Sequence, residues 1–369
     1  MSVGTDPAAP PAAAMQGKPG LRGAGFLGEA LHWAFLTVVP ILAALVVAGL
    51  ILLAVGKDPI SYYGFVVERG LLSPSGRQQT FTRMAPLLFI AAGLIVAFRA
   101  GLWNLGGDGQ FLLGAVAAGA LAPWLITVAP GWLTLTLSFV AATLVAMLWS
   151  LLPAMLRAWQ GVNEIITTLM MSFLGVSLAN VFIKLVFLDP GTTVPQTRTL
   201  PVADRLPRLW DTTVTSGLVF GLIAIILVHL MMTRTSFGLK LRVVGANPRA
   251  AIHAGLNMPA LTIAVFALSA GLIGMGGAVD IVGIQGNVRA DWNPAYAFAV
   301  IPMVFLARMN GFAAIGFVFL LSMLWIGGES AARRIGVPHH FTLVLVAIVL
   351  VMLALAEWID HRFRASRRV

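Results

Sequence analysis

Apolar runs of about the length of a membrane-spanning helix follow one another along most of this chain. Of the 369 residues, 59% are hydrophobic and only 10% are charged, whereas soluble globular proteins carry about 25% charged residues. A spanning helix needs about 20 consecutive apolar residues, so the chain has room for roughly ten spans joined by short loops. The sequence therefore predicts an all-α, polytopic membrane protein of about ten transmembrane helices.

The order of these runs sets the expected domain organisation. Residues 1–30 are rich in Ala, Pro and Gly and predict a disordered cytoplasmic tail. Residues 31–358 form the expected transmembrane domain, and residues 359–369 form a basic cytoplasmic tail. Residues 57–83 predict an amphipathic surface segment, whereas residues 189–211, with four prolines and no apolar periodicity, predict a water-facing loop. Spans are expected at 33–55, 84–98, 111–126, 132–156, 163–188, 214–232, 259–282, 294–306, 312–326 and 341–358.

The formal net charge of +10 fits a membrane protein whose topology is held by basic loops. A cytoplasmic N-terminus places Arg99, Arg157, the basic residues of segment 234–249, Arg308 and the C-terminal arginines on the inner side. The chain has no interleaved basic and aromatic run of the kind that binds nucleic acid. It also has no Cys, which excludes thiol catalysis, thiolate metal sites and disulfides. The arginines that fall on the outer side are Arg69, Arg77, Arg83, Arg198, Arg205, Arg208, Arg289, Arg333 and Arg334.

The segment FRAGLWNLGGDGQ, residues 98–110, carries an arginine, an asparagine, an aspartate, a glutamine and four glycines next to a strongly apolar run. Non-helical backbone at membrane depth is tolerated only inside protein or along a water-filled cavity. One interpretation is the wall of a polar translocation path, with Arg99 and Asp108 facing the interior, where they can pair. The other is an ordinary cytoplasmic turn. Ionisable groups within a membrane indicate a functional site by default, which favours the path.

Two further segments contain candidate functional carboxylates. Asn163 is expected to cap a helix, and Glu164 either stabilises that helix start or pairs with Arg99 across the bundle. Residues 101–108 and 271–280 are both Gly-rich, end on an aspartate and are expected to interrupt a span. Such interruptions in two inverted halves indicate a transport site, although Gly-rich helix interfaces also recur without one. Asp280 is then either pore-lining or a solvated helix end.

The loop at about 233–258 is basic and contains no acidic residue. Asn247 is expected to cap a short helix, with Pro248 at its first position and Gly255 at its end. A short capped helix in a basic cytoplasmic loop suits docking to a soluble partner, and a plain connector is the alternative.

Three segments together, FRAGLWNLGGDGQ, NEIITTLMMSFLG and GLKLRVVGANPRAAIHAGLN, resemble the permease subunits of bacterial ABC importers, in the branch that contains branched-chain amino acid and ribose permeases. The likeness is closest to nucleoside and simple-sugar permeases that work with basic-membrane-protein-type binding lipoproteins. It covers nearly all of the chain beyond about residue 30. Each motif alone is weak, but their order and spacing are specific.

The resemblance implies roles for individual residues. The family's asparagine–glycine motif lies beside the translocation path, which implies that role for Asn104, Gly106, Gly107, Gly109 and Gln110. Trp103, Asp108, Asn163 and Glu164 complete the candidate substrate path. The family usually has Glu at the position of Asp108, so the charge is kept with a shorter reach. The segment that resembles the family's ATPase-coupling loop maps to Gly245, Asn247, Pro248, Ala251 and Gly255.

The resemblance also implies partners and a mechanism. No G-x-x-x-x-G-K-[ST] motif for nucleotide phosphates occurs in the chain, so a separate ABC ATPase subunit must hydrolyse ATP and no cofactor is bound directly. The expected partners are that ATPase, a second permease in a heterodimer and a periplasmic or lipoprotein substrate-binding protein. The expected location is the bacterial inner membrane with both termini cytoplasmic, and the expected mechanism is alternating access.

Two other classes of function compete with this interpretation. An ion- or proton-coupled secondary transporter would use Asp108, Glu164 and Asp280 as coupling carboxylates. An intramembrane enzyme is disfavoured because the six His and the absence of Cys give no recognisable nucleophile–base or metal spacing. The substrate stays open between a nucleoside and a sugar, since Trp103 can stack and Asn104 or Gln110 can hydrogen-bond in either case.

Overall fold

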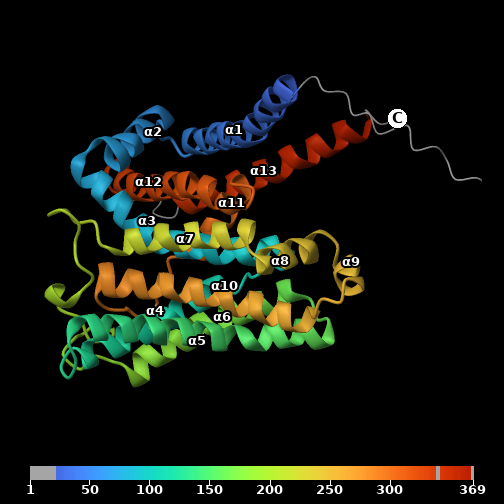
Figure 1. Cartoon of the computed structure of the whole chain (residues 1–369). Helices are drawn as coiled ribbons and strands as arrows, with labels where there is room; N and C mark the ends of the chain where they lie inside the picture. Colours follow the sequence, from blue (N-terminus) through green and yellow to red (C-terminus); the bar gives the residue numbers. More distant parts are fainter. Residues whose placement is uncertain (1–21, 338–340, 367–369) are drawn as a thin grey trace, which may run out of the picture.

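A computed structural model describes residues 22–337 and 341–366 of the chain (Figure 1). Within these residues the protein is a bundle of thirteen α-helices, with two isolated β-bridges and no extended strand. This confirms the all-α class. The helices are α1 (Arg22–Ala54), α2 (Pro59–Val67), α3 (Pro74–Arg99), α4 (Gly107–Leu125), α5 (Gly131–Gln160), α6 (Glu164–Val181), α7 (Gly217–Arg234), α8 (Ser236–Ala246), α9 (Pro248–His253), α10 (Met258–Asp280), α11 (Tyr296–Leu306), α12 (Gly311–Ile335) and α13 (Phe341–Ser366).

All ten predicted spans coincide with helices, which confirms a polytopic membrane protein. Six helical segments among the described residues are long and apolar enough to cross a membrane, and they belong to α3, α5, α6, α7, α10 and α12. Single π-helical turns extend α6 to Val186 and α10 to Gln285. Shorter apolar stretches lie in α1, α11 and α13. The tenth helix is α4, whose first turn carries the polar residues of the sequence motif.

Several helix boundaries differ from those expected. α1 begins at Arg22, inside the predicted N-terminal tail, whose residues 1–21 lie outside the described part. α3 begins at Pro74, because Ser73 accepts a hydrogen bond from the Gly76 N–H (3.2 Å) and Pro74 occupies the first helical position. The predicted surface segment is therefore helical too, formed by α2, a π-helical turn and the start of α3. α13 runs to Ser366 and so includes most of the predicted basic tail.

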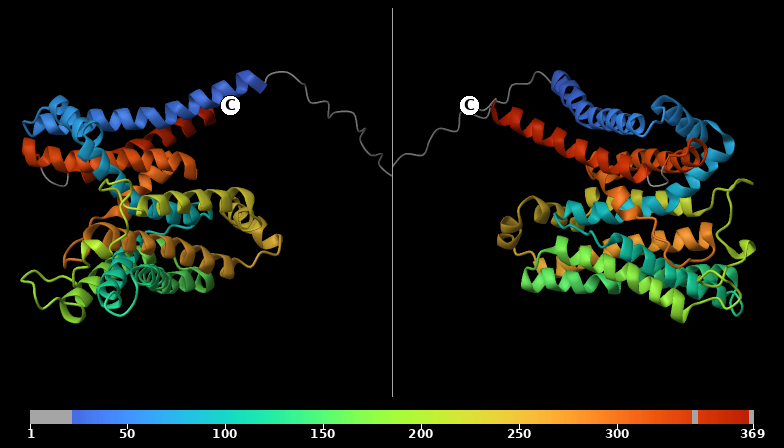
Figure 2. Two further views of the ribbon diagram at one scale, coloured as in Figure 1. Left: turned by 60° about the vertical axis from the view of Figure 1, so that its left-hand side comes forward. Right: turned by 180° about the vertical axis from the view of Figure 1, so that it is seen from behind.

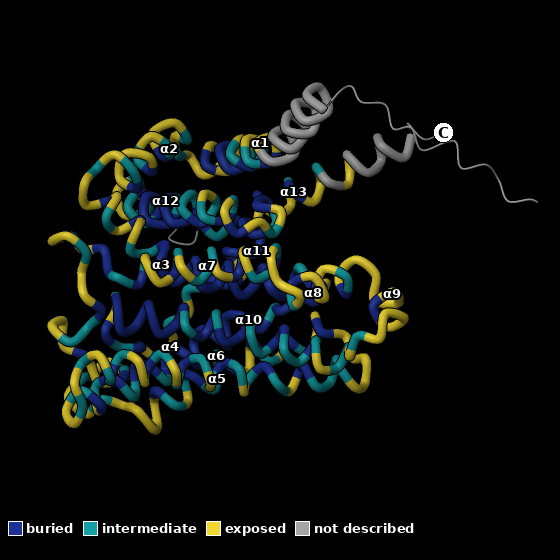
Figure 3. The backbone as a smooth tube through the Cα atoms, viewed as in Figure 1, coloured by how far each residue is buried: buried dark blue, intermediate teal, exposed yellow. Residues whose placement is uncertain are grey.

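The helices lie roughly parallel in two groups, which Figures 1 and 2 show from three sides. One group contains α1, α2, α11, α12 and α13, and the other contains α4, α5, α6, α7 and α10. α3 lies between them and packs against α7, α10, α11 and α12. The 18-residue apolar window of α3 is 89% buried, against 22% for that of α5. Figure 3 shows the same contrast between a buried centre and exposed outer helices.

The two ends of the bundle have different structures. The short helices α8 and α9 project from one end, and the long loop between α6 and α7 covers the other end (Figure 1). The start of α1 and the end of α13 lie at the same end as α8 and α9. Among the described residues, the start of α1, the end of α13 and the basic loop thus lie at one end of the bundle. We call the end that carries α8 and α9 the α9 end.

Candidate functional site

The polar motif turns back into the bundle. α3 ends at Arg99 and α4 begins at Gly107. Between them, the Leu105 N–H donates to Thr168 Oγ1 (3.1 Å), and in the first turn of α4 the Gly109 N–H donates to Ser172 Oγ (3.2 Å). Ser172 lies about 12 Å along α6 from the start of that helix, at about 1.5 Å per residue. The first turn of α4 is therefore inside the bundle and not in an exposed turn at its end.

Asn104 and Gln110 form a reciprocal amide pair in this interior. Each side-chain amide donates to the other's oxygen at 3.0 Å. Asn104 also donates to Ser269 Oγ on α10 (2.9 Å) and accepts from the Gly106 N–H (3.2 Å). Both residues are 1% exposed. Their polar groups thus hold the turn in place and are not directed at an open cavity in this conformation.

Asp108 joins two helix starts. Its Oδ1 accepts a hydrogen bond from the Ala297 N–H (2.8 Å), at the first turn of α11, and the residue itself lies in the first turn of α4. A carboxylate is stabilised by the positive end of a helix dipole, and here two such ends meet at one side chain. The expected pair with Arg99 is wrong, because Arg99 Nε donates to the Met309 carbonyl instead (3.2 Å).

The glycines of the motif allow neighbouring backbones to come close. A Cβ atom at Gly107 would lie 2.5 Å from Ala297 Cβ, and one at Gly109 would lie 2.9 Å from the Ser172 carbonyl oxygen. At Gly106 it would lie 2.9 Å from Gln110 Nε2. Any larger residue would push α4 away from α6 or α11. The glycines therefore position the site by packing.

Trp103 carries the exposed side chain of the motif. It is 38% exposed, whereas Asn104 and Gln110 are buried. Its ring lies against Phe98 (centroids 5.2 Å apart) and Phe305 (5.5 Å), and these two rings also stack on each other (5.0 Å). Within the motif, Trp103 is thus the side chain best placed to contact a solute.

The second motif forms the start of α6. Asn163 caps the helix, because its Oδ1 accepts from the Ile165 N–H (2.9 Å), as predicted. Glu164 forms an ion pair with Arg157 at the end of α5 (3.2 Å). The alternative pairing of Glu164 with Arg99 is therefore wrong. The contact closes the α5–α6 turn and leaves Glu164 at the edge of the bundle.

The predicted coupling loop contains two helices. Asn247 Oδ1 accepts from the Ala250 N–H (3.1 Å), Pro248 occupies the first position of α9, and Gly255 follows it with φ of +74°. These three predictions are confirmed, and Ala251 is the buried residue of α9. The sequence reasoning missed α8, whose N-cap is Thr235.

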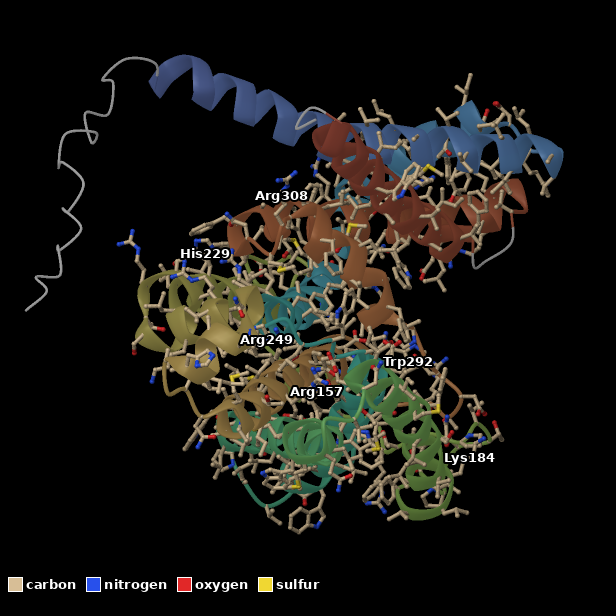
Figure 4. The ribbon with its side chains drawn as sticks, turned by 90° about the vertical axis from the view of Figure 1, so that its right-hand side faces the viewer. Arg157, Lys184, His229, Arg249, Trp292 and Arg308 are labelled. Atoms are coloured by element: carbon tan, nitrogen blue, oxygen red, sulfur yellow. The ribbon has the colours of Figure 1, made fainter. Side chains whose placement is uncertain are left out.

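The end of α8 packs directly against the turn that follows α3. A Cβ at Gly101 would lie 3.1 Å from Gly245 Cα, and a Cβ at Gly245 would lie 2.4 Å from the Arg99 carbonyl oxygen. Figure 4 looks onto this end of the molecule, where Arg157, Arg249 and Arg308 are labelled. The polar motif at 98–110 and the coupling-like loop at about 233–258 are thus in direct contact. No local sequence pattern indicates this contact.

The second Gly-rich motif does not interrupt a helix, which corrects the expectation. Residues 271–280 lie within the continuous α10, and a π-helical turn begins only at Ile281. Asp280 is fully buried, and neither carboxylate oxygen has a hydrogen-bond partner among the described residues. The three candidate carboxylates thus differ in their contacts: Asp108 is hydrogen-bonded to a helix start, Glu164 is ion-paired with Arg157, and Asp280 has no hydrogen-bond partner among the described residues. In the described part of the chain no three His, Asp or Glu side chains form a group that could hold a metal ion.

Comparison with known proteins agrees with this architecture. Residues 77–354 match the family model described as the permease component of branched-chain amino acid transport systems. A glucose ABC transporter permease protein of Haloferax volcanii is 31% identical, over 89% of this chain and 89% of the relative. A nucleoside ABC transporter permease protein of Lactococcus lactis is 26% identical (86% and 90%), and a guanosine ABC transporter permease protein of Bacillus subtilis is 27% identical (75% and 80%). No solved structure matches the chain. The fold, the motifs and these relatives together show that the chain belongs to the family of branched-chain amino acid-type ABC transporter permeases.

Proposed function

We propose that this chain is the transmembrane permease subunit of an ATP-driven importer for a simple sugar or a nucleoside, with no catalytic activity or cofactor of its own. The relatives named for glucose, nucleoside and guanosine transport support this substrate range. The observation that carries the proposal is the contact between Gly101 and Gly245. It connects α8 and the capped helix α9, which is suited to docking a soluble ATPase, with the turn between α3 and α4 inside the bundle.

This contact supports a mechanism of alternating access. An ATPase bound to α9 moves α8, and α8 moves the turn at Gly101. That turn is rigidly tied to the start of α4 by the Asn104–Gln110 pair, and Asp108 ties α4 to the start of α11. The starts of α4 and α11 therefore move together. The path for the solute runs beside them, with Trp103 and the start of α6 along its wall. The buried residues Asn104, Asp108 and Gln110 hold that wall in place.

A second permease covers the face formed by α6 and the segment before α11. That segment, 286–295, contains no helix, only bends, a turn and an isolated bridge residue. Asn293 on it is exposed. Lys184 and Asp291 form an exposed ion pair there (3.0 Å). The first half of this segment pairs with the outer loop, because the Thr197 N–H donates to the Val288 carbonyl (3.0 Å). The second half leads to the start of α11 beside the buried Asp108, and irregular backbone at that depth does not face lipid. Such a face is found only where it is buried against protein or lines a water-filled path. This fits a heterodimer with the solute path at its interface.

The proposed location is the bacterial inner membrane. The α9 end carries Arg157, Arg249 and Arg308, which Figure 4 labels, and α8 with Lys240 and Arg242 (Figure 1). Basic residues favour the cytoplasmic side. Both termini are then cytoplasmic, and a periplasmic or lipoprotein binding protein delivers the solute to the opposite end, where the long loop between α6 and α7 lies.

One observation favours a second candidate, an ion-coupled secondary transporter. Asp280 is a fully buried carboxylate without a hydrogen-bond partner among the described residues, and such groups often serve proton or ion transfer in membranes. This candidate predicts uptake by the chain without an ATPase, so the two functions are separable by experiment.

The test measures uptake of labelled glucose, ribose, uridine and adenosine by cells that express this chain. Each measurement is made with and without the candidate ATPase and second permease, and again with a protonophore. We expect uptake to require the ATPase and to survive the protonophore. Uptake by the chain alone that collapses with the protonophore would overturn the proposal in favour of ion coupling through Asp280. The preferred label assigns the substrate.

A further inference from the structure

A long apolar groove lies on the face of the bundle opposite the proposed permease interface. Its volume is about 1040 Å³, and it is lined by α5, α7 and α10, with residues such as Val140, Leu144, Leu227 and Leu272. Figure 1 shows α10 between α7 and α5. No acidic residue lines the groove. In Figure 4 the ribbon from α7 to α10 lies on the left, whereas the labelled Trp292 and Lys184 lie on the right.

One end of this groove carries a cation. Arg234 lines it at the last residue of α7. Arg234 is exposed and has no hydrogen bond or ion pair with any other described residue. The groove runs along α7 from Phe220 to Arg234, which is about 21 Å at about 1.5 Å per residue. One leaflet of the hydrocarbon core is about 15 Å thick, so the groove is long enough for a complete acyl chain.

We propose that this groove binds an anionic phospholipid of the leaflet at the α9 end, with one acyl chain along α7 and the phosphate at Arg234. The apolar walls exclude water and suit a hydrocarbon chain. A guanidinium presents a planar fork of donors that matches phosphate geometry. The irregular backbone that we assign to the second permease and the solute path lies on the other side of the bundle, so this regular helical face is left to lipid. The proposal does not depend on which solute is transported.

The site lies at a mechanically important junction. Thr235, next to Arg234, also lines the groove and caps α8, because its Oγ1 accepts from the Gly238 N–H (3.1 Å) and donates to the Met231 carbonyl (2.7 Å). α8 leads to the contact of Gly245 with the turn after α3. A bound headgroup therefore touches the hinge between α7 and the ATPase-docking segment.

The test uses native mass spectrometry of the full chain in detergent, titrated with phosphatidylglycerol or with phosphatidylcholine of the same acyl chains. We expect wild type to bind phosphatidylglycerol more tightly. Arg234→Ala should weaken that binding by about fivefold, as for one basic side chain near an anionic headgroup, and should remove the preference. Ala224→Trp, which fills the groove wall, should weaken both lipids. The matched control Arg249→Ala, at the same end on α9, should change neither.

Two results would overturn the proposal. One is equal phosphatidylglycerol affinity in wild type and Arg234→Ala, or an equal loss in Arg234→Ala and Arg249→Ala, which would mean general surface charge. The other comes from a photo-crosslinking amino acid at Leu227, 59% exposed on the groove wall, in the assembled transporter. A lipid adduct supports the site, whereas an adduct with the second permease shows that protein covers the groove.

Discussion

Among single residues of the motif, Asn104 and Gln110 depend most on each other, because their side chains form a buried reciprocal pair. Both amides are buried and satisfy each other. Asn104→Ala leaves the Gln110 amide buried without its partner and should lower the free energy of unfolding by about 1–3 kcal/mol. Gln110→Ala should cost less, because Asn104 keeps its bonds to Ser269 and the Gly106 N–H. The double variant should lose less than the sum, with a coupling of about 0.5 kcal/mol or more. Denaturation of the purified chain in detergent measures this cycle, and additive losses would contradict the pairing.

Asp108 supports a second prediction at this scale. Its carboxylate accepts the Ala297 N–H inside the protein, so Asp108→Ala leaves a buried donor unsatisfied and should cost about 1–3 kcal/mol. Asp108→Asn keeps an acceptor but removes the charge at two helix starts, and we expect a smaller loss, of about 0.3–1 kcal/mol. The control is Glu68→Ala, an exposed carboxylate with helical backbone outside the site, which should have almost no effect. If Asp108→Asn were as damaging as Asp108→Ala, the carboxylate would have a role beyond this hydrogen bond.

At the scale of elements, the contact of α8 with the turn after α3 carries a prediction about coupling. Gly245→Ala would place a Cβ 2.4 Å from the Arg99 carbonyl oxygen, and overpacking of this kind costs about 1–3 kcal/mol. Because the strained atoms are backbone, α8 must move away from α3. We expect ATP-driven uptake to fall by about tenfold or more, while the ATPase still co-purifies with the chain. Gly316→Ala on α12, where nothing lies within 4 Å, is the matched control and should be silent.

The same scale shows what the sequence could and could not predict. The ten apolar runs predicted their helices because burial in lipid requires a fixed length of apolar chain. α8 was missed although Phe237, Leu241 and Val244 have the spacing of an apolar helix face, because the helix has only 11 residues and its start depends on the single hydroxyl of Thr235. Local sequence patterns also could not predict that the first turn of α4 lies inside the bundle. This position depends on tertiary hydrogen bonds such as that from Leu105 to Thr168, which join segments far apart in the sequence.

The outer arginines show a similar limit. They violate the expected distribution of charge, yet several have structural contacts in the bundle. Arg205 donates to the carbonyls of Leu200 and Ile284 (3.1 and 2.9 Å) and so holds the outer loop against the end of α10. Arg69 and Arg334 both lie over the ring of Phe65. The distribution of Lys and Arg indicates topology only where these side chains remain in water. Sequence alone does not distinguish them from basic side chains that have partners within the protein.

At the scale of the whole molecule, the two faces of the bundle are predicted to have different neighbours. The face of α6 adjoins irregular backbone, which we propose the second permease covers, whereas the face of α7 is regular and apolar. Phe173 on α6 and Leu227 on α7 are matched probes, because they are 58% and 59% exposed. The chain contains no Cys, so Phe173→Cys and Leu227→Cys each introduce one unique thiol.

In the assembled transporter we expect a thiol-reactive photo-crosslinker, such as benzophenone maleimide, attached at position 173 to capture the second permease. The same reagent at position 227 should capture none, because lipid lies there. Without the second permease, both thiols should react equally with a membrane-soluble maleimide, since both are exposed in the single chain. A subunit adduct from position 227 and none from position 173 would reverse the assignment of the faces. That result would move the solute path away from α6 and at the same time displace the phospholipid from its groove.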